Sequence, residues 1–122
     1  MLFYIQHFFL EQLNMKYIID IDGTICTEHF DKNGNKDYTK AEPIKERINY
    51  LNELYDLGHE VHYWTARGTM TGINHKNLTE TQLIKWGCKY HSLRVGDKPN
   101  YDFWIDDKAR WSEDFFKNVL KN

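Results

Sequence analysis

Short apolar runs alternate with amphipathic stretches along this chain. Runs rich in β-branched and aromatic residues are typical of buried strands, and they occupy residues 17–19, 60–64 and 101–105. A further short strand is expected at residues 92–95. Apolar residues at helical spacing occupy the stretches between and after them, residues 43–57, a stretch that ends at residue 86, and residues 112–120. Strands that alternate with helices predict a parallel sheet with helices on both faces. The expected fold is therefore an α/β domain with three layers, a doubly wound, Rossmann-like parallel sheet.

Local signals mark the ends of these helices. Pro43 suits the first turn of the first helix, and Gly58 suits its end. The second helix starts either at the capping-box pattern that Thr79 opens or about a turn earlier, at Asn74. Ser112 is expected to cap the last helix.

Residues 25–40, between the first strand and the first helix, are polar and mixed in charge. Asn33-Gly34 lies near their centre and is a strong local signal for a hairpin turn. Two interpretations stay open: a small flap, residues 25–40, that leans over Asp20 and Asp22, or an ordinary disordered loop.

Acidic residues follow the first and the fourth expected strands. Asp20 and Asp22 leave the first strand two residues apart, so they project from one side of an extended chain and repel each other unless a cation lies between them. Because parallel strands present their carboxyl ends at one edge of a sheet, polar residues that follow different strands should gather there. This edge is expected to carry Asp20, Asp22, Thr65, Lys98, Asp106 and Asp107.

These side chains suit phosphoryl transfer. Four carboxylates with a lysine and a hydroxyl, and without His or Cys, favour a hard cation, most often Mg²⁺. An aspartate can attack phosphorus while the metal, the lysine and the hydroxyl hold the charge of the transferring group. A second carboxylate two residues on can protonate the leaving oxygen and later activate water.

Four short motifs follow one another along the chain: Asp20-Ile21-Asp22-Gly23-Thr24, Thr65, Lys98 and Asp106-Asp107. In this order they resemble the four motifs of the haloacid dehalogenase-like superfamily of phosphohydrolases. The resemblance implies that Asp20 is the nucleophile and Asp22 the general acid/base, with an aspartyl-phosphate intermediate. It implies that Mg²⁺ is held by Asp20, Asp22, Asp106 and Asp107, with Asp22 acting through its carbonyl and Asp106 as the more direct ligand of its pair. Phosphate binding falls to Thr65, Ala66, Arg67 and Lys98, although Arg67 could equally be a surface residue.

The spacing of the motifs leaves no room for a cap domain, either after Thr24 or between Thr65 and Lys98. The chain therefore resembles capless members of the superfamily, which act on large substrates or borrow a lid from a second copy. A narrower likeness to small bacterial members of capsule or lipopolysaccharide sugar synthesis implies a phosphorylated small-molecule substrate, such as a sugar phosphate, and a homo-oligomer.

Length, charge and cysteine content narrow the picture. A chain of 122 residues holds one domain, expected at residues 15–122, with residues 1–14 as an extension or an amphipathic helix. A net charge of −2 without a Lys/Arg run disfavours nucleic acid and membrane surfaces as partners. The apolar first ten residues lack the marks of a signal peptide and are too short to span a bilayer. Two isolated cysteines fit a reducing cytosol, so a cytoplasmic location is expected.

Two other functions remain open beside the phosphatase. A phosphorylated signalling receiver also places acids, Thr and Lys around Mg²⁺, but in receivers the adjacent acids come first, whereas here they come last. A non-catalytic module that binds metal or phosphate would not need a carboxylate at Asp22.

Overall fold

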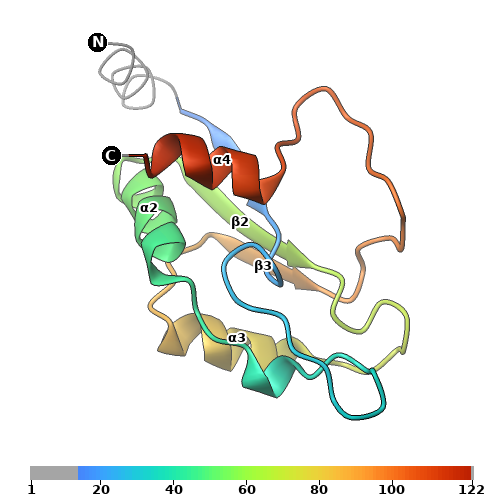
Figure 1. Ribbon diagram of the computed structural model, residues 1–122. Coiled ribbons are helices and arrows are strands. Elements are labelled where there is room, and N and C mark those ends of the chain that lie inside the picture. The colour runs from blue at the N-terminus through green and yellow to red at the C-terminus, as the bar shows by residue number, and fades with distance from the viewer. Residues whose placement is uncertain (1–13, 122) are drawn as a thin grey trace.

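The computed structural model describes residues 14–121 of the 122-residue chain, so residues 1–13 of the expected N-terminal extension lie outside the described residues. Figure 1 shows helices packed beside a short sheet. In chain order the elements are β1 (Lys16–Ile19), the 3-10 helix η1 (Tyr38–Lys40), α2 (Lys45–Asp56), β2 (Glu60–Thr65), α3 (Lys76–Lys85), β3 (Ser92–Val95) and α4 (Ser112–Val119).

The three strands form one parallel sheet in the order β1-β2-β3. In its register Ile19 lies opposite Tyr63, and Tyr63 lies opposite Leu93. The strands expected at residues 17–19, 60–64 and 92–95 are thus confirmed. α2 and α3 supply the crossover connections that parallel neighbours need.

Only one face of this sheet is buried among the described residues. Along β2, Val61, Tyr63 and Thr65 are almost fully buried, whereas the residues between them are partly exposed. The α/β class is confirmed, but the second helical layer of a three-layer, doubly wound sheet is not present in residues 14–121. The reason is topological: two crossovers of the same hand that step in the same direction place both helices on the same face.

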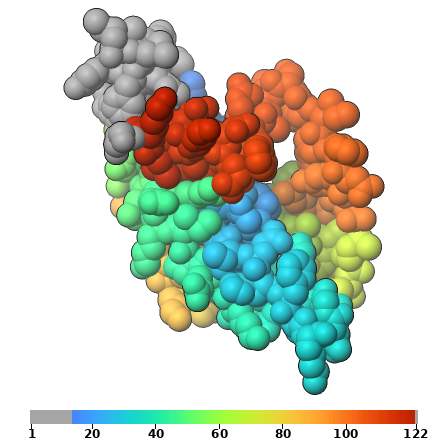
Figure 2. Space-filling view, in the orientation of Figure 1, coloured from blue at the N-terminus to red at the C-terminus, as the bar shows by residue number. Residues whose placement is uncertain are grey.

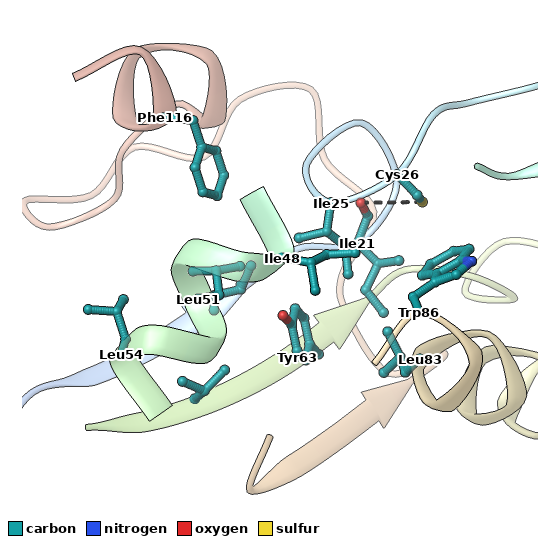
Figure 3. Close-up of a cluster of buried hydrophobic side chains, with 12 residues drawn as sticks. Ile21, Ile25, Cys26, Ile48, Leu51, Leu54, Tyr63, Leu83, Trp86 and Phe116 are labelled. Atoms are coloured by element: carbon teal, nitrogen blue, oxygen red, sulfur yellow. Dashed lines mark hydrogen bonds between the residues drawn. The ribbon is translucent and has the colours of Figure 1, made fainter. Parts of the chain in front are cut away.

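One cluster of apolar side chains holds the domain together, and Figure 3 shows helices and sheet converging on it. α2 contributes Ile48, Leu51 and Leu54 to this cluster, while Leu83 comes from α3 and Phe116 from α4. Full burial of such a side chain stabilises the fold by about 1.5–3 kcal/mol. The helices are therefore held chiefly by this shared core.

The start of α2 differs from the expectation. The helix begins at Lys45 with Ile44 as its N-cap, so Pro43 precedes the helix and does not lie in its first turn. Pro43 instead forms an antiparallel bridge with Cys26, and the N–H of Ile44 donates to the carbonyl of Ile25 at 2.8 Å. These contacts keep the chain extended for two residues longer than the proline alone predicts.

α3 starts at Lys76, which agrees with the earlier of the two expected starts. The side-chain oxygen of Asn74 accepts the N–H of Lys76 at 2.9 Å. Thr79 lies inside the helix and its hydroxyl donates to the carbonyl of His75 at 2.7 Å, so the capping-box start was wrong. Gly58 ends α2 as expected, with a φ of 97°.

The last helix is confirmed, although its cap is not the expected one. Trp111 is the N-cap of α4, and Ser112 is the first helical residue. The Ser112 hydroxyl donates instead to the carbonyl of Gly23 at 3.4 Å. A second link joins α4 to α2, because Arg47 donates to Glu113 at 3.0 Å.

The fourth strand expected at residues 101–105 is wrong. This segment is irregular and exposed, with 85% of Phe103 and 94% of Ile105 accessible to solvent, and Figure 2 shows open space between it and the body of the domain. Residues 96–100 alone link it to β3, and a parallel crossover needs about a dozen residues or more. An aromatic contact joins the segment to β2, since Trp104 lies edge-on to Trp64 with 6.2 Å between ring centroids. Within the segment, Tyr101 lies edge-on to Trp104 at 5.0 Å.

The longest helix in residues 14–121 is α2, with 12 residues. None of the helices in this range has the length and apolar character required to cross a bilayer.

Candidate functional site

The chain turns sharply as it leaves β1, and this turn carries both aspartates of the first motif. The N–H groups of Thr24 and Ile25 donate to the carbonyl of Ile21 at 3.0 and 2.9 Å. Ile21 and Ile25 are fully buried on either side of Asp22. Gly23 adopts a φ of 77°, a left-handed conformation that favours glycine. A buried, hydrogen-bonded turn therefore fixes the backbone positions from which the side chains of Asp20 and Asp22 project.

Asp20 and Lys98 form an ion pair at the carboxyl edge of the sheet. The Lys98 Nζ lies 3.3 Å from Asp20 Oδ1, and the Thr24 hydroxyl lies 3.5 Å from Oδ2. The lysine side chain is 12% exposed, whereas that of Asp20 is 42% exposed. The structure thus brings together two residues 78 positions apart and leaves the carboxylate accessible.

Asp22 has a different partner, the buried Arg67. Arg67 Nε donates to Asp22 Oδ2 at 2.9 Å, and Nη2 donates to Oδ1 at 2.8 Å. Two parallel hydrogen bonds of this kind are the strongest geometry for a guanidinium and a carboxylate. The Arg67 side chain is 0% exposed and that of Asp22 is 13% exposed. The two aspartates therefore belong to separate groups of contacts.

The other donors of Arg67 are also occupied. Nη1 donates to the Thr79 hydroxyl at 3.2 Å and to the side-chain oxygen of Gln82, and Nη2 lies 4.0 Å from the Cys26 sulfur. Burial disfavours the charge of Arg67, but hydrogen bonding and charge from Asp22 outweigh burial and hold its pKa above the ordinary value. All five N–H groups of the guanidinium have partners, so Arg67 is neither a surface residue nor free to bind phosphate in this arrangement.

Cys26 completes the surroundings of Asp22. Its buried thiol donates to Asp22 Oδ1 at 3.5 Å. Burial first, and then the charge of Asp22, raise the pKa of Cys26 to about 12. The thiol therefore stays protonated near neutral pH and acts as a weak donor rather than a nucleophile.

The turn after β2 does not present its threonine to solvent. Thr65 is 1% exposed and its hydroxyl accepts the N–H of Arg67 at 3.2 Å. Ala66 is exposed, and its carbonyl accepts the N–H of Thr69 at 2.9 Å. Gly68 has a φ of 86°, and a Cβ there would lie 2.1 Å from the carbonyl oxygen of Ile73. The Thr65 hydroxyl, which was predicted to bind phosphate, thus accepts a hydrogen bond from the backbone of the turn that follows it.

Asp106 and Asp107 do not join the aspartates of the first motif. Asp106 accepts the N–H of Lys108 at 2.8 Å and the indole N–H of Trp104 at 3.4 Å, both within its own exposed segment. The Lys108 hydrogen bond foremost, and then those from Asp107 and Trp104, hold the pKa of Asp106 below its ordinary value. Within residues 14–121, no three carboxylate, His or Cys side chains gather to hold a metal ion. The predicted magnesium ligands are therefore not assembled by the described residues.

The hairpin expected at Asn33-Gly34 is present in the flap. Phe30 and Lys36 form an antiparallel bridge, and Asp31 Oδ1 accepts the N–H groups of Asn33 and Asn35 at 2.8 and 3.0 Å. A small hollow lies between the flap and the first motif, lined among others by Asp22, His29, Lys36 and Tyr38. The flap is therefore an ordered hairpin that borders Asp22, and the disordered-loop interpretation was wrong.

Two buried partners of Arg67, Thr79 and Gln82, do not stand out in the sequence because both fall in the capping-box pattern. Both are buried in α3 and both accept hydrogen bonds from Arg67. Their spacing offers a signal, since they share a helix face with Leu83 and Trp86, which are buried. Polar residues on the buried face of a helix require a buried polar partner.

Comparison with known proteins gives one informative likeness. No protein-family model matches the chain, and no curated protein matches it. A crystal structure of an MCSG target from Vibrio cholerae is similar, with 26% sequence identity over 88% of this chain and 94% of that chain and a TM-score of 0.68. Together with the parallel sheet, this likeness shows that the chain has a small α/β fold compatible with the Rossmann-like class.

Proposed function

We propose that this protein is a phosphatase that hydrolyses a phosphate monoester, with Asp20 as the nucleophile. The observation that carries the proposal is the Asp20–Lys98 ion pair, in which an accessible aspartate side chain lies 3.3 Å from the ammonium group of a largely buried lysine side chain. Phosphate and carboxylate repel each other, and a fixed cation beside the nucleophile offsets that repulsion. The pair lies at the carboxyl edge of a parallel sheet, where ligands bind in open α/β folds.

The reaction would run in two displacements. First, an oxygen of Asp20 bonds to phosphorus while the bond to the leaving oxygen breaks, and that oxygen takes up a proton. Water then attacks the phosphorus of the aspartyl-phosphate and loses a proton to a base, and inorganic phosphate leaves as the Asp20–phosphorus bond breaks. Lys98 would hold the charge of the transferring group in both steps.

Asp22 is the proposed acid/base, by resemblance to the superfamily. In the arrangement described, both of its oxygens accept hydrogen bonds from Arg67. Each oxygen keeps a second lone pair, but the two hydrogen bonds hold the carboxylate facing the guanidinium and not a leaving group. Proton donation to the leaving oxygen therefore requires Asp22 to exchange Arg67 for another partner.

Magnesium enters the proposal by the same resemblance, and the described residues fit it only in part. Asp20 offers one carboxylate and Asp22 a backbone carbonyl, whereas Asp106 and Asp107 lie outside this group. A magnesium requirement would need these last acids to approach Asp20. The substrate class inferred from the resemblance is a phosphorylated small molecule, such as a sugar phosphate of surface-polysaccharide synthesis.

The second candidate is a module that binds phosphate without catalysis. The Asp22–Arg67 pair favours it, because a buried bidentate ion pair gives Asp22 a structural use that needs no proton transfer. In that case Asp20 and Lys98 would still bind an anion or its counter-ion, but no phosphate would be released.

Phosphate release from p-nitrophenyl phosphate, with and without Mg²⁺, distinguishes the two. We expect metal-dependent release by the wild type and a loss on the order of 10³-fold or more for Asp20→Asn. Asp56→Asn is the matched control, since Asp56 also pairs with a lysine but on the surface of α2. Release that persists in Asp20→Asn, or needs no metal, would contradict the proposal.

A further inference from the structure

We propose that Arg67 is a positioning residue that holds Asp22 and, through Gln82, couples it to the flap. A chain of polar contacts, buried at its centre and partly buried at its ends, runs from the Asp22 carboxylate to the Arg67 guanidinium, the Gln82 side chain and the carbonyl of Tyr38. Only the catalytic consequence of this coupling rests on the proposed function. The chain of contacts itself can be tested without any activity.

Gln82 is the link, and the orientation of its amide follows from its two partners. Its oxygen accepts from Arg67 Nη1, and its nitrogen donates to the Tyr38 carbonyl at 2.7 Å. Reversing the amide would place an NH₂ group against a guanidinium and an oxygen against a carbonyl, and both contacts would be repulsive. Gln82 therefore connects a donor on one side to an acceptor on the other, a task that few side chains can perform.

Tyr38 ties the flap to this chain by two contacts. Besides its carbonyl bond to Gln82, its ring lies under the guanidinium, with 4.7 Å from Arg67 Cζ to the ring centroid. The residue before it, Asp37, donates its N–H to the carbonyl of His29 across the hairpin at 2.8 Å. A displacement of the hairpin is therefore expected to displace Tyr38 and, through Gln82, Arg67.

Breaking the contact between Arg67 and Asp22 is energetically unfavourable while the other contacts of Arg67 persist. Its side chain is fully buried, so the guanidinium has no water to replace a lost carboxylate. Loss of the Gln82 and Tyr38 contacts would let Arg67 shift, and only then could Asp22 turn toward another partner. Movement of the flap by a bound substrate is thus the event expected to free Asp22 for proton transfer, so that the acid is delivered only when a substrate is present.

The first test measures the coupling without activity, by amide hydrogen exchange of residues 29–41. Gln82→Met removes the link to the flap. Thr79→Val is the matched control, because Thr79 also accepts from Arg67 and lies on the same helix but is not bonded to the flap. We expect the flap amides to exchange about tenfold faster in Gln82→Met and at the wild-type rate in Thr79→Val. Equal exchange in all three proteins would overturn the coupling.

A second variant covers the case in which Gln82→Met fails to fold. Gln82→Glu keeps the size and the oxygen acceptor for Arg67 but has no donor for the Tyr38 carbonyl, so it should loosen the flap in the same way. Because coupling is reciprocal, Asp22→Asn alone should also speed amide hydrogen exchange in the flap. The double variant Asp22→Asn with Gln82→Glu should exchange no faster than Gln82→Glu alone. Additive effects of these two changes would contradict the relay.

The catalytic consequence is tested with two substrates that differ in leaving group. A p-nitrophenolate leaves without a proton, whereas the alkoxide of glycerol 2-phosphate needs one. Gln82→Glu keeps an acceptor for Arg67 but loses the link to the flap, so movement of the flap can no longer shift Arg67 and free Asp22. We therefore expect this variant to lower kcat on glycerol 2-phosphate about tenfold and to leave kcat on p-nitrophenyl phosphate within threefold, with Thr79→Val unchanged on both. An equal fall on both substrates would mean a merely structural role. A wild type without any phosphatase activity would refute the proposed function, while the exchange result would still decide the coupling.

Discussion

Replacing Arg67 by methionine tests the physical basis of the site most sharply. The change keeps most of the apolar stem and removes the cation that neutralises Asp22. It leaves Asp22 without its charged partner, and it takes one hydrogen-bond donor each from Thr79 and Gln82. Removal of one partner from a buried ion pair costs about 3–5 kcal/mol. Because the Asp22 side chain is 13% exposed and can draw some solvent, we expect the lower part of this range, about 3 kcal/mol.

Urea denaturation followed by circular dichroism measures this cost. With a slope of about 1–3 kcal/mol per molar urea for a small domain, the midpoint should fall by roughly 1–3 M. Arg94→Met is the matched control, because Arg94 binds Asp97 through Nε and Nη2 at 2.9 and 2.7 Å but is 56% exposed. An exposed pair of this kind contributes little, so its midpoint should barely move. Equal losses for the two variants, or no loss for Arg67→Met, would refute the reasoning.

Two further predictions concern stability. Because burial raises the pKa of Cys26 from 9.0 to about 12, the folded protein keeps this thiol protonated while the unfolded chain ionises above about pH 9. The free energy of unfolding should therefore fall as the pH rises from 9 toward 12, and urea titrations at pH 8 and 10 should show a smaller fall for Cys26→Ala; an unchanged pH dependence would contradict the assignment. Gly68→Ala combines a φ of 86° with a Cβ 2.1 Å from the Ile73 carbonyl oxygen, so thermal melts should show a loss above the roughly 1–2 kcal/mol of a left-handed alanine alone. Gly72→Ala has a φ of 74° in open space and should show that smaller loss; the same shift for both alanines would count against the contact.

Local pattern was sufficient to predict the three strands of the sheet and the closeness of Lys98 to Asp20. Short apolar runs located β1 and β2, the short segment at residues 92–95 was expected as β3, and the rule that parallel strands end at one edge placed Lys98 near Asp20. Both inferences depend on periodicity and topology, which a single sequence carries. The segment at residues 101–105 is richer in aromatic residues than β3, yet it is no strand, because β propensity reflects a packed neighbourhood that this segment lacks.

The environment of Asp22 could not be predicted in the same way. Arg67 stands in a polar turn that looks exposed, and the partners that bury it lie 45, 12 and 15 residues away, at Asp22, Thr79 and Gln82. No local signal joins these positions. The order of the motifs therefore singled out the polar residues of the candidate site. Only the structure shows that Asp20 pairs with Lys98 and Asp22 with Arg67.

The measurement that tests the central claim most directly is the identification of a covalent intermediate. The protein is mixed with p-nitrophenyl phosphate and Mg²⁺, quenched in acid within the first turnover, digested, and analysed by peptide mass spectrometry. The account predicts one added phosphoryl group on the peptide that contains Asp20, sensitive to hydroxylamine as an acyl phosphate and missing in Asp20→Asn. A phosphoryl group on another residue, or turnover without any modified peptide, would contradict it.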